Sequence, residues 1–293
     1  MTPSIEHAAA LIRAGRLVAF PTETVYGLGA NALDAKAVAR IFAAKGRPHS
    51  SPLIVHVDSI EMARELASSW CDAADLLARR YWPGPLTLVV PKRALVPDIV
   101  TAGLPTVGLR MPAHPLALEL IRAARVPIAA PSANRFSELS PTAAAHVPEA
   151  LADYTLDGGP ARVGIESTVL SLVDAPVLLR PGVISITELE SLVGPILLGG
   201  APAEGPHAAP GMHARHYRPV TPLYLDTRCR EGKGVVLRIG QEMPADPRAY
   251  AAVLYETLHR LDTQSLDWIA VEAPPDTPEW AGVLDRLQHA AVT

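Results

Sequence analysis

Four short polar segments stand among apolar neighbours in this sequence, and their residue types suit the binding of anionic substrates. They span residues 21–29, 45–48, 106–112 and 130–134. The first carries two threonines and a glutamate, and the third carries an arginine that closes an apolar run. The fourth offers hydroxyl and amide groups, with 140–142 behind it. Loops at the ends of strands are where functional groups concentrate, so these segments are the first candidates for a site.

Lys45 and Arg47 form the most specific pair. They are separated by Gly46, which lets the backbone approach a ligand closely. Lysine supplies a point charge and arginine a planar fork of donors, a combination that suits a polyphosphate. Ser51 and His56 follow within reach.

Each segment also has a purely structural interpretation, which for 21–29 is an ordinary turn whose hydroxyl groups bond within the turn. Lys45 at the end of a helix would compensate the helix dipole. The Arg110 guanidinium would bind a substrate carboxylate through two parallel hydrogen bonds, or it would pair with an acidic side chain of the protein. Both interpretations fit the sequence equally. Ser132 and Asn134 would contact phosphate or ribose, or cap a turn.

Other familiar motifs are incomplete. Residues 27–32 fit a loose dinucleotide-binding pattern, but the acidic residue expected about 20 positions later is missing. Gly232-Lys233-Gly234 is not a Walker loop, and His213 and His216 have no third metal ligand nearby. No serine or cysteine has the surroundings of a nucleophile. We therefore expect a site that holds anionic substrates in line and stabilises charge, without covalent catalysis and without a metal cage.

Composition narrows the class of protein. The 293 residues carry 26 Lys and Arg against 30 Asp and Glu, a net charge of −4, and aromatic residues make up 5%. A general nucleic-acid binder would show a basic stripe, and a single-strand binder would show stacking aromatics. Strong direct binding of nucleic acid is therefore not expected.

The two cysteines, Cys71 and Cys229, cannot build a disulfide framework. The N-terminus lacks a basic region followed by an apolar one, and no apolar run approaches membrane-spanning length. These features predict a cytoplasmic protein that does not enter a membrane.

Hydrophobic periodicity predicts strands that alternate with helices, which is typical of an α/β fold with a mixed sheet. We expect helices over 5–14, 35–44, 60–68, 72–80, 115–124, 186–193, 247–261 and 278–290. We expect strands over 17–20, 53–57, 86–91, 107–110, 127–130, 167–173, 177–180, 221–226, 234–238 and 268–271.

A stretch rich in Gly, Pro and Ala divides the chain. We predict one domain over 1–200, a linker over 201–218 and a small α/β domain over 219–293. The last unit holds 7 basic and 11 acidic residues, whereas 1–218 holds 19 of each, so the acidic excess lies entirely in the tail.

Taken together, the segments resemble the threonylcarbamoyl-AMP synthase family, whose catalytic unit is a YrdC-like domain. The resemblance covers about 1–200, and 209–217 resembles the linker of the long form with a small C-terminal domain. The matching runs are 21–29, 45–48 with 52–57, 82–87, 106–112, 131–134 with 140–142, 164–169 and 179–182.

The resemblance implies a YrdC-like twisted mixed sheet with flanking helices and a small C-terminal α/β (Rossmann-like) domain. It implies an enzyme that makes threonylcarbamoyl-AMP and pyrophosphate from L-threonine, bicarbonate and ATP, with Mg²⁺ accompanying the ATP. A separate transferase complex would then modify tRNA. The linker would fold over the nucleotide as a lid.

The resemblance also implies roles for individual residues. Lys45 and Arg47 would be catalytic, facing the pyrophosphate. The threonine-binding residues would be Thr24, His56, Arg110, Ala130 and Ser167. The nucleotide-binding residues would be Lys45, Arg47, Ser51, Thr106, Ser132, Asn134, Ser140, Arg180 and Tyr217.

Two other functions remain open on the sequence. One is a carbamoyltransferase that handles carbamoyl-adenylate, because YrdC-like domains also occur in such proteins. The other is a non-catalytic RNA-binding module, which the neutral first part and acidic tail disfavour.

Overall fold

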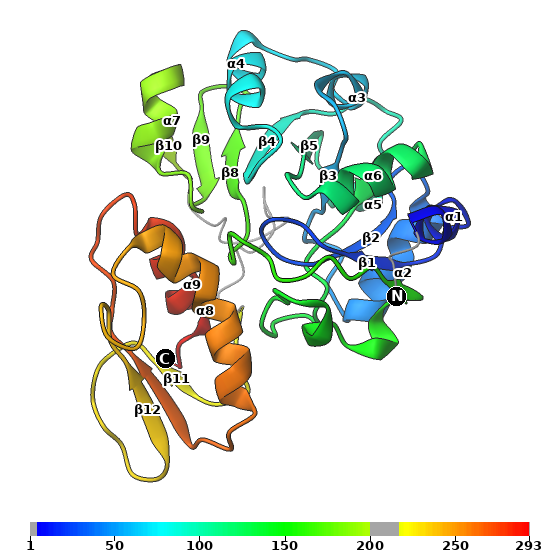
Figure 1. Cartoon of the computed structure of the whole chain (residues 1–293). Helices are drawn as coiled ribbons and strands as arrows, with labels where there is room; N and C mark the ends of the chain where they lie inside the picture. The colour runs from blue at the N-terminus through cyan, green and yellow to red at the C-terminus, as the bar shows by residue number, and fades with distance from the viewer. Residues whose placement is uncertain (1–4, 200–216, 293) are drawn as a thin grey trace.

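The computed structural model describes residues 5–199 and 217–292. Most of the predicted linker, and with it the predicted lid, lies outside the described residues. The predicted domain boundaries at 200 and 219 border that stretch and stay predictions. The α/β class is confirmed, with a larger and a smaller sheet flanked by helices (Figure 1).

Within residues 5–199, ten strands form one mixed sheet in the order β10-β9-β8-β4-β5-β3-β6-β2-β1-β7. Parallel pairs such as β3–β5 and β4–β8 alternate with antiparallel pairs such as β4–β5 and β3–β6. The strands are β1 (Val18–Phe20), β2 (Gly27–Asn31), β3 (Ile54–His56), β4 (Leu86–Pro91), β5 (Thr106–Arg110), β6 (Ile128–Ala129), β7 (Tyr154–Thr155), β8 (Thr168–Ser171), β9 (Val177–Arg180) and β10 (Leu197–Leu198).

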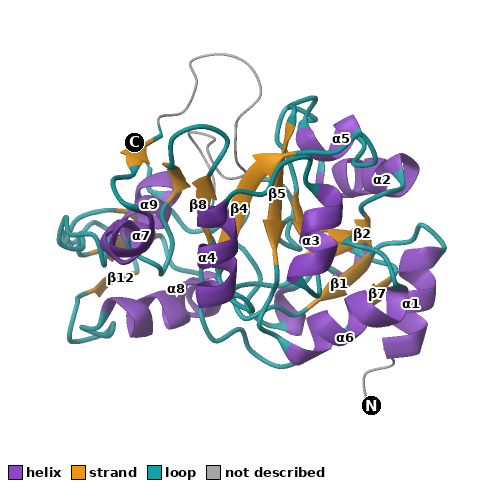
Figure 2. Cartoon of the chain, turned by 90° about the horizontal axis from the view of Figure 1, so that it is seen from above, coloured by secondary structure: helices purple, strands orange, loops and turns teal. Residues whose placement is uncertain are grey.

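Helices cover this sheet, and Figure 2 shows α1 and α6 side by side along one flank. These two helices share a core with Phe20 and Ile128, whereas α2 and α4 belong to a second, larger core. The helical segments are α1 (Ile5–Arg13), α2 (Ala35–Lys45), α3 (Ile60–Leu66), α4 (Asp72–Tyr81), α5 (Asp98–Thr101), α6 (Pro115–Ala124), η1 (Ala144–His146), η2 (Glu149–Leu151) and α7 (Ile186–Val193). Among the described residues, no helix is both long and apolar enough to traverse a bilayer.

Residues 217–292 form the small unit. Its three strands are all parallel, in the order β11-β13-β12, and two helices pack with them. The elements are β11 (Leu223–Tyr224), β12 (Gly234–Leu237), α8 (Pro247–Asp262), β13 (Trp268–Val271) and α9 (Ala281–Ala290). In Figure 1 the helices α8 and α9 lie toward the large unit.

The interpretation of 21–29 as a loop was wrong over its last residues. Gly27–Asn31 forms β2, which pairs with β1 and β6 and is the third strand from one edge of the sheet. A Cβ at Gly29 would stand 2.8 Å from side-chain atoms of Phe20 and Ile128. Close packing within the sheet therefore requires a glycine at this position, whereas the sequence pattern predicts that the glycine is part of a loop.

Helix α2 brings the Lys45–Arg47 pair into place. Asp34 caps its start by accepting from the backbone N–H groups of Lys36 and Ala37. The helix ends at Gly46, whose φ of +62° belongs to the left-handed region. The chain therefore turns between the two cations and sends Arg47 away from the helix axis.

Gly46→Ala tests this turn. No atom stands within 4 Å of an added Cβ, so the cost comes from the backbone conformation alone. We expect the free energy of unfolding to fall by about 1 kcal/mol in urea titration. Gly46→Asn, which tolerates this conformation better, should lose clearly less. Equal losses for both variants would contradict the assignment.

Candidate active site

A cleft lies over one face of the large sheet, where loops after several strands meet. His56 and Arg110 pair directly across the parallel strands β3 and β5, and Ile54 shares their face because side chains alternate along a strand. The lining residues are Thr22, Thr24, Val25, Gly27, Arg47, Ile54, His56, Arg110, Ala130, Pro131, Ser132, Glu166, Ser167, Arg180 and Tyr217.

All five predicted threonine-binding residues lie in this cleft: Thr24, His56, Arg110, Ala130 and Ser167. Of the predicted nucleotide residues, Arg47, Ser132, Arg180 and Tyr217 line it directly. The structure thus brings together residues that are scattered over almost 200 positions of sequence.

Arg110 is held by a buried carboxylate. Its Nη2 lies 2.7 Å from Oε1 of Glu23, and its Nε donates to the carbonyl of Gly84. The second oxygen of Glu23 accepts from the backbone N–H of Ala113 at 2.9 Å. Arg110 therefore pairs with a structural acid and also lines the cleft, and its binding of a substrate carboxylate stays a prediction. Sequence reasoning noted Glu23 as a polar group but missed it as this partner.

His56 is buried beside that arginine. Burial, and next the charge of Arg110, lower the pKa of His56 to about 3, so the imidazole is neutral near neutral pH. Its Nδ1 has no hydrogen-bond partner among the described residues. A neutral imidazole with a spare nitrogen can bind a polar ligand without adding charge.

Lys45 and Arg47 are both buried and both bonded to protein oxygens. The Lys45 ammonium donates to the carbonyls of Ser132 and Asn134. Arg47 donates through Nη2 to Ser51 Oγ and the carbonyl of Pro52. Burial, followed by the charge of Arg47, lowers the pKa of Lys45, and burial lowers that of Arg47 to about 10.

The roles of the two cations consequently differ in this structure. Arg47 lines the cleft, with its Nε lacking a partner among the described residues. Lys45 lies behind it and ties the loop after β6 to the end of α2. Ser51 is a partner of Arg47, so it contributes by holding the guanidinium.

The remaining predicted nucleotide residues lie behind or beside the cleft. Asn134 donates through Nδ2 to the carbonyls of Arg135 and Glu138, and the Ser140 hydroxyl donates to Glu166. Thr106 begins β5, four residues from Arg110, and lines a smaller cavity that shares Ile54 with the cleft. At about 3.3 Å per residue, Thr106 is roughly 13 Å from Arg110 along the strand.

Ser167 and Arg180 also line the cleft and are bonded to each other. Arg180 donates through Nε and Nη2 to the carbonyl of Ser167, at 3.1 and 2.9 Å, and Ser167 Oγ lies 2.8 Å from Thr87 Oγ1. Tyr217 is buried and also lines the cleft.

Charge is unbalanced in and around the cleft. The buried ionic side chains there are five cations (Lys45, Arg47, Arg110, Arg180 and Arg286) and two carboxylates (Glu23 and Glu166), among the described residues. The partly exposed Asp285 also pairs with Arg286, with 2.6 Å between Oδ2 and Nη1. A region so rich in buried cations favours the binding of anions. The arrangement therefore suits a substrate set with a carboxylate and several phosphate charges.

No group of three His, Cys, Asp or Glu residues in 5–199 or 217–292 is placed to hold a metal ion. The two carboxylates nearest the cleft, Glu23 and Glu166, are both paired with arginines.

Comparison with known proteins decides the family. The Sua5/YciO/YrdC family, described as telomere recombination, matches residues 10–182, and the C-terminal domain of threonylcarbamoyl-AMP synthase matches residues 184–292. The chain belongs to the threonylcarbamoyl-AMP synthase family. Both parts of the chain are thereby accounted for, and the synthase is favoured over the carbamoyltransferase and the RNA-binding module.

Relatives and solved structures agree. Threonylcarbamoyl-AMP synthase of Pyrococcus abyssi is 43% identical over 98% of this chain and 94% of its own length. That of Bacillus subtilis is 42% identical over 99% of this chain and 93% of its length. A crystal structure of P. abyssi Sua5 complexed with L-threonine matches with a TM-score of 0.91 and 41% identity, covering 98% of this chain and 94% of that one.

The buried His56 predicts a specific pH dependence of stability. The unfolded state takes up a proton as the pH falls below 6.5, whereas the folded state does so only near 3, so folding is progressively weakened by acid. Between about pH 7 and about pH 5 this group should remove about 2 kcal/mol of stability. Urea unfolding at both pH values should show a drop larger by that amount in the wild type than in His56→Gln. The exposed His7→Gln should keep the wild-type drop, and equal drops in all three proteins would contradict the buried neutral state.

Proposed function

We propose that this enzyme joins L-threonine, bicarbonate and ATP into threonylcarbamoyl-AMP, with release of pyrophosphate. The observation that carries the proposal is that the guanidinium groups of Arg47 and Arg110 and the neutral imidazole of His56 converge on one cleft. The threonine carboxylate and the triphosphate are anions of the kind that guanidinium groups bind. The L-threonine complex of the P. abyssi relative supports the same substrate.

Threonine is proposed to bind beside Arg110. The guanidinium, oriented by Glu23 and Gly84, presents its fork to the carboxylate. Neutral His56 and the hydroxyls of Thr24 and Ser167 supply polar contacts, and Ala130 leaves room for the side chain.

The nucleotide is proposed to lie across Arg47 and Arg180. Ser132 and Tyr217 line the same cleft, while Lys45, Ser51, Asn134 and Ser140 support these residues from behind. The Thr106 cavity adjoins the cleft through Ile54 and offers a place for a further part of the nucleotide. In this arrangement Lys45 acts mainly by shaping the loop after β6, and Arg47 faces the phosphates.

The reaction has two bond-forming steps. The neutral threonine amine attacks the carbon of bicarbonate, and loss of water leaves a carbamate. A carbamate oxygen then attacks the α-phosphorus of ATP, and the bond to the leaving pyrophosphate breaks. Both steps profit from holding the reactants in line, and the second profits from cations that stabilise the departing charge. Mg²⁺, proposed to enter with ATP, would share in neutralising the phosphates.

The product is an activated acyl-adenylate that must be passed on. We propose that a tRNA threonylcarbamoyl transferase complex consumes it in the cytoplasm. The enzyme itself does not need to bind tRNA strongly. This agrees with its net charge of −4, because strong binding of nucleic acid relies on an excess of basic residues.

Pyrophosphate release tests the reaction directly. With ATP and bicarbonate present, release should depend strictly on added L-threonine. L-Serine, which lacks the methyl group, should support less release. Release that is independent of any amino acid would overturn the proposal.

Arg47→Ala tests the phosphate contact. Loss of charge-assisted hydrogen bonds of about 1.5–3 kcal/mol should raise the KM for ATP about tenfold or more. Arg40→Ala is the matched control, because Arg40 lies on α2, just before the Arg47 turn, but its side chain is 42% exposed and 3.4 Å from Asp153. Unchanged KM in Arg47→Ala, or an equal rise in the control, would contradict the assigned role.

A further inference from the structure

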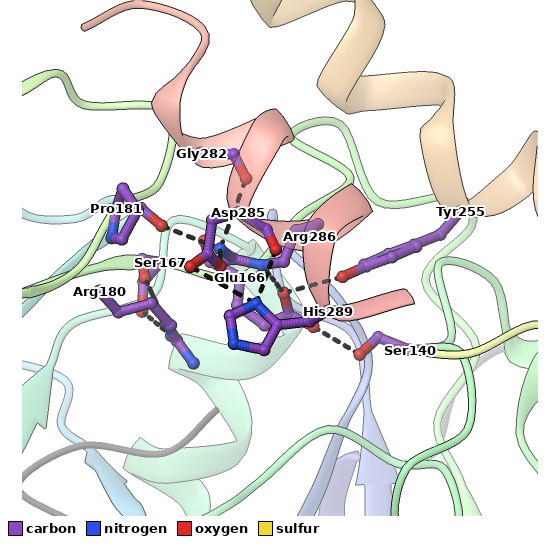
Figure 3. A network of polar contacts seen from close by, with 10 residues as sticks. All are labelled: Ser140, Glu166, Ser167, Arg180, Pro181, Tyr255, Gly282, Asp285, Arg286 and His289. Atoms are coloured by element: carbon purple, nitrogen blue, oxygen red, sulfur yellow. Dashed lines mark hydrogen bonds and ion pairs between the residues drawn. The ribbon is translucent and has the colours of Figure 1, made fainter. Parts of the chain in front are cut away.

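Arg286 of the small unit reaches the back of the cleft. It lies on α9, and its side chain is completely buried. Figure 3 shows it between the Glu166 carboxylate and the carbonyl of Pro181. Its Nε lies 2.7 Å from Glu166 Oε2, its Nη2 donates to the Glu166 carbonyl at 3.2 Å, and its Nη1 donates to the Pro181 carbonyl at 3.0 Å.

The groups that Arg286 contacts belong to a cleft residue, Glu166, or to a sequence neighbour of one, Pro181. Glu166 directly precedes Ser167, and Pro181 directly follows Arg180. Ser167 and Arg180 are in turn bonded to each other through the Ser167 carbonyl. One planar guanidinium therefore joins two loops of the large unit, one through the cleft residue Glu166 and the other directly beside the cleft residue Arg180.

Glu166 is organised around this arginine. It also accepts from the hydroxyls of Ser140 and of Tyr255 on α8. Burial alone would raise the pKa of Glu166, but the charges of Arg286 and Arg180 and the Ser140 hydrogen bond outweigh it and lower that pKa to about 2. The carboxylate therefore stays ionised and remains a strong acceptor for Arg286.

Two glycines let the small unit approach this closely. A Cβ at Gly282 would stand 2.5 Å from the carbonyl oxygen of Gly182, and a Cβ at Gly164 would stand 2.2 Å from that of Ala251. Backbone thus packs on backbone at both sides of the Arg286 contacts. This leaves little freedom for α8 and α9 to shift relative to the two loops.

We propose that Arg286 is a positioning residue for the synthase reaction, through which the small unit fixes Ser167 and Arg180 in the geometry that binds both substrates. It acts through the Glu166 and Pro181 contacts and does not itself line the cleft. The inference rests on the proposed function, because Ser167 and Arg180 matter to the reaction only if the cleft binds threonine and nucleotide.

The test is steady-state pyrophosphate release by the full chain with Arg286→Met. Displacement of Ser167 and Arg180 should raise the KM values for L-threonine and ATP, each by about tenfold or more. A residue needed only for folding would reduce the amount of active enzyme, which lowers apparent kcat and leaves both KM values unchanged. Arg286→Lys, which keeps the charge but loses the fork, should give intermediate KM values.

Arg248→Met is the matched control. Arg248 lies on α8 and pairs with Glu188 of α7 at 2.8 Å, so it also links the two units, but the side chains are 67% and 40% exposed. Its removal should leave both KM values within about twofold of the wild type, because an exposed pair contributes little.

Gly282→Ala tests the same coupling through α9, including the case in which Arg286→Met does not fold. Alanine favours the helix itself, but its Cβ must push α9 away from the Gly182 loop. The same rise of both KM values is expected, with every charge retained. Wild-type KM values in the folded variants at 286 and 282 would overturn the proposal. Absence of threonine-dependent release in the wild type would instead overturn the proposed function.

Discussion

The cost of burying charge governs this structure. Five cations and two carboxylates are buried in and around one cleft among the described residues, and an uncompensated buried charge is strongly destabilising. Two of the arginines are matched by carboxylates, Arg110 by Glu23 and Arg286 by Glu166. Lys45, Arg47 and Arg180 also donate to carbonyl or hydroxyl oxygens of the protein. Arg47 and Arg180 line the cleft, where they can meet a bound anion.

This constraint explains why the loops of the cleft are tied so heavily to one another. Lys45 bonds the loop after β6, Arg47 bonds Ser51, and Arg180 bonds Ser167. Each bond solvates a buried cation and fixes a loop at the same time. The stability of the fold and the preorganisation of the site therefore come from the same contacts. A preorganised site loses less conformational entropy when it binds flexible, highly charged substrates.

The small unit belongs to this charge arrangement. Its sequence carries the acidic excess of the chain, yet beside Tyr217 it brings a buried arginine to the site region. Close backbone contacts at Gly164 and Gly282 surround that arginine. The sequence separates the two units clearly, but their stabilities are coupled. Glu166 of the large unit is buried and depends on Arg286 of the small unit for its counter-charge.

Much of the fold could be predicted from sequence where periodicity is strong. Helices 115–124 and 186–193 and strands 177–180 and 268–271 have the predicted bounds. The helix expected over 278–290 begins only at Ala281, and the two-residue strands β7 and β10 were missed because so short a run has no period to detect. The strand at 27–31 was missed because glycines that serve close packing look like glycines that serve a turn.

The candidate site divides in the same way. Arg110, His56 and Arg47 could be selected because charged or polar groups directly follow apolar runs. Their partners could not be selected, because Glu23 and Arg110 are 87 positions apart and Glu166 and Arg286 are 120 positions apart. Such pairs are determined by tertiary packing, and local sequence patterns do not predict them.

The central claim is that one cleft assembles threonine, bicarbonate and ATP into a single adenylate. The most direct measurement is mass spectrometry of the product formed by the purified enzyme from isotopically labelled bicarbonate. The account predicts an adenylate that contains threonine and carries the label in its carbamoyl carbon. A threonine adenylate without the labelled carbon, or no threonine-containing adenylate at all, would contradict it.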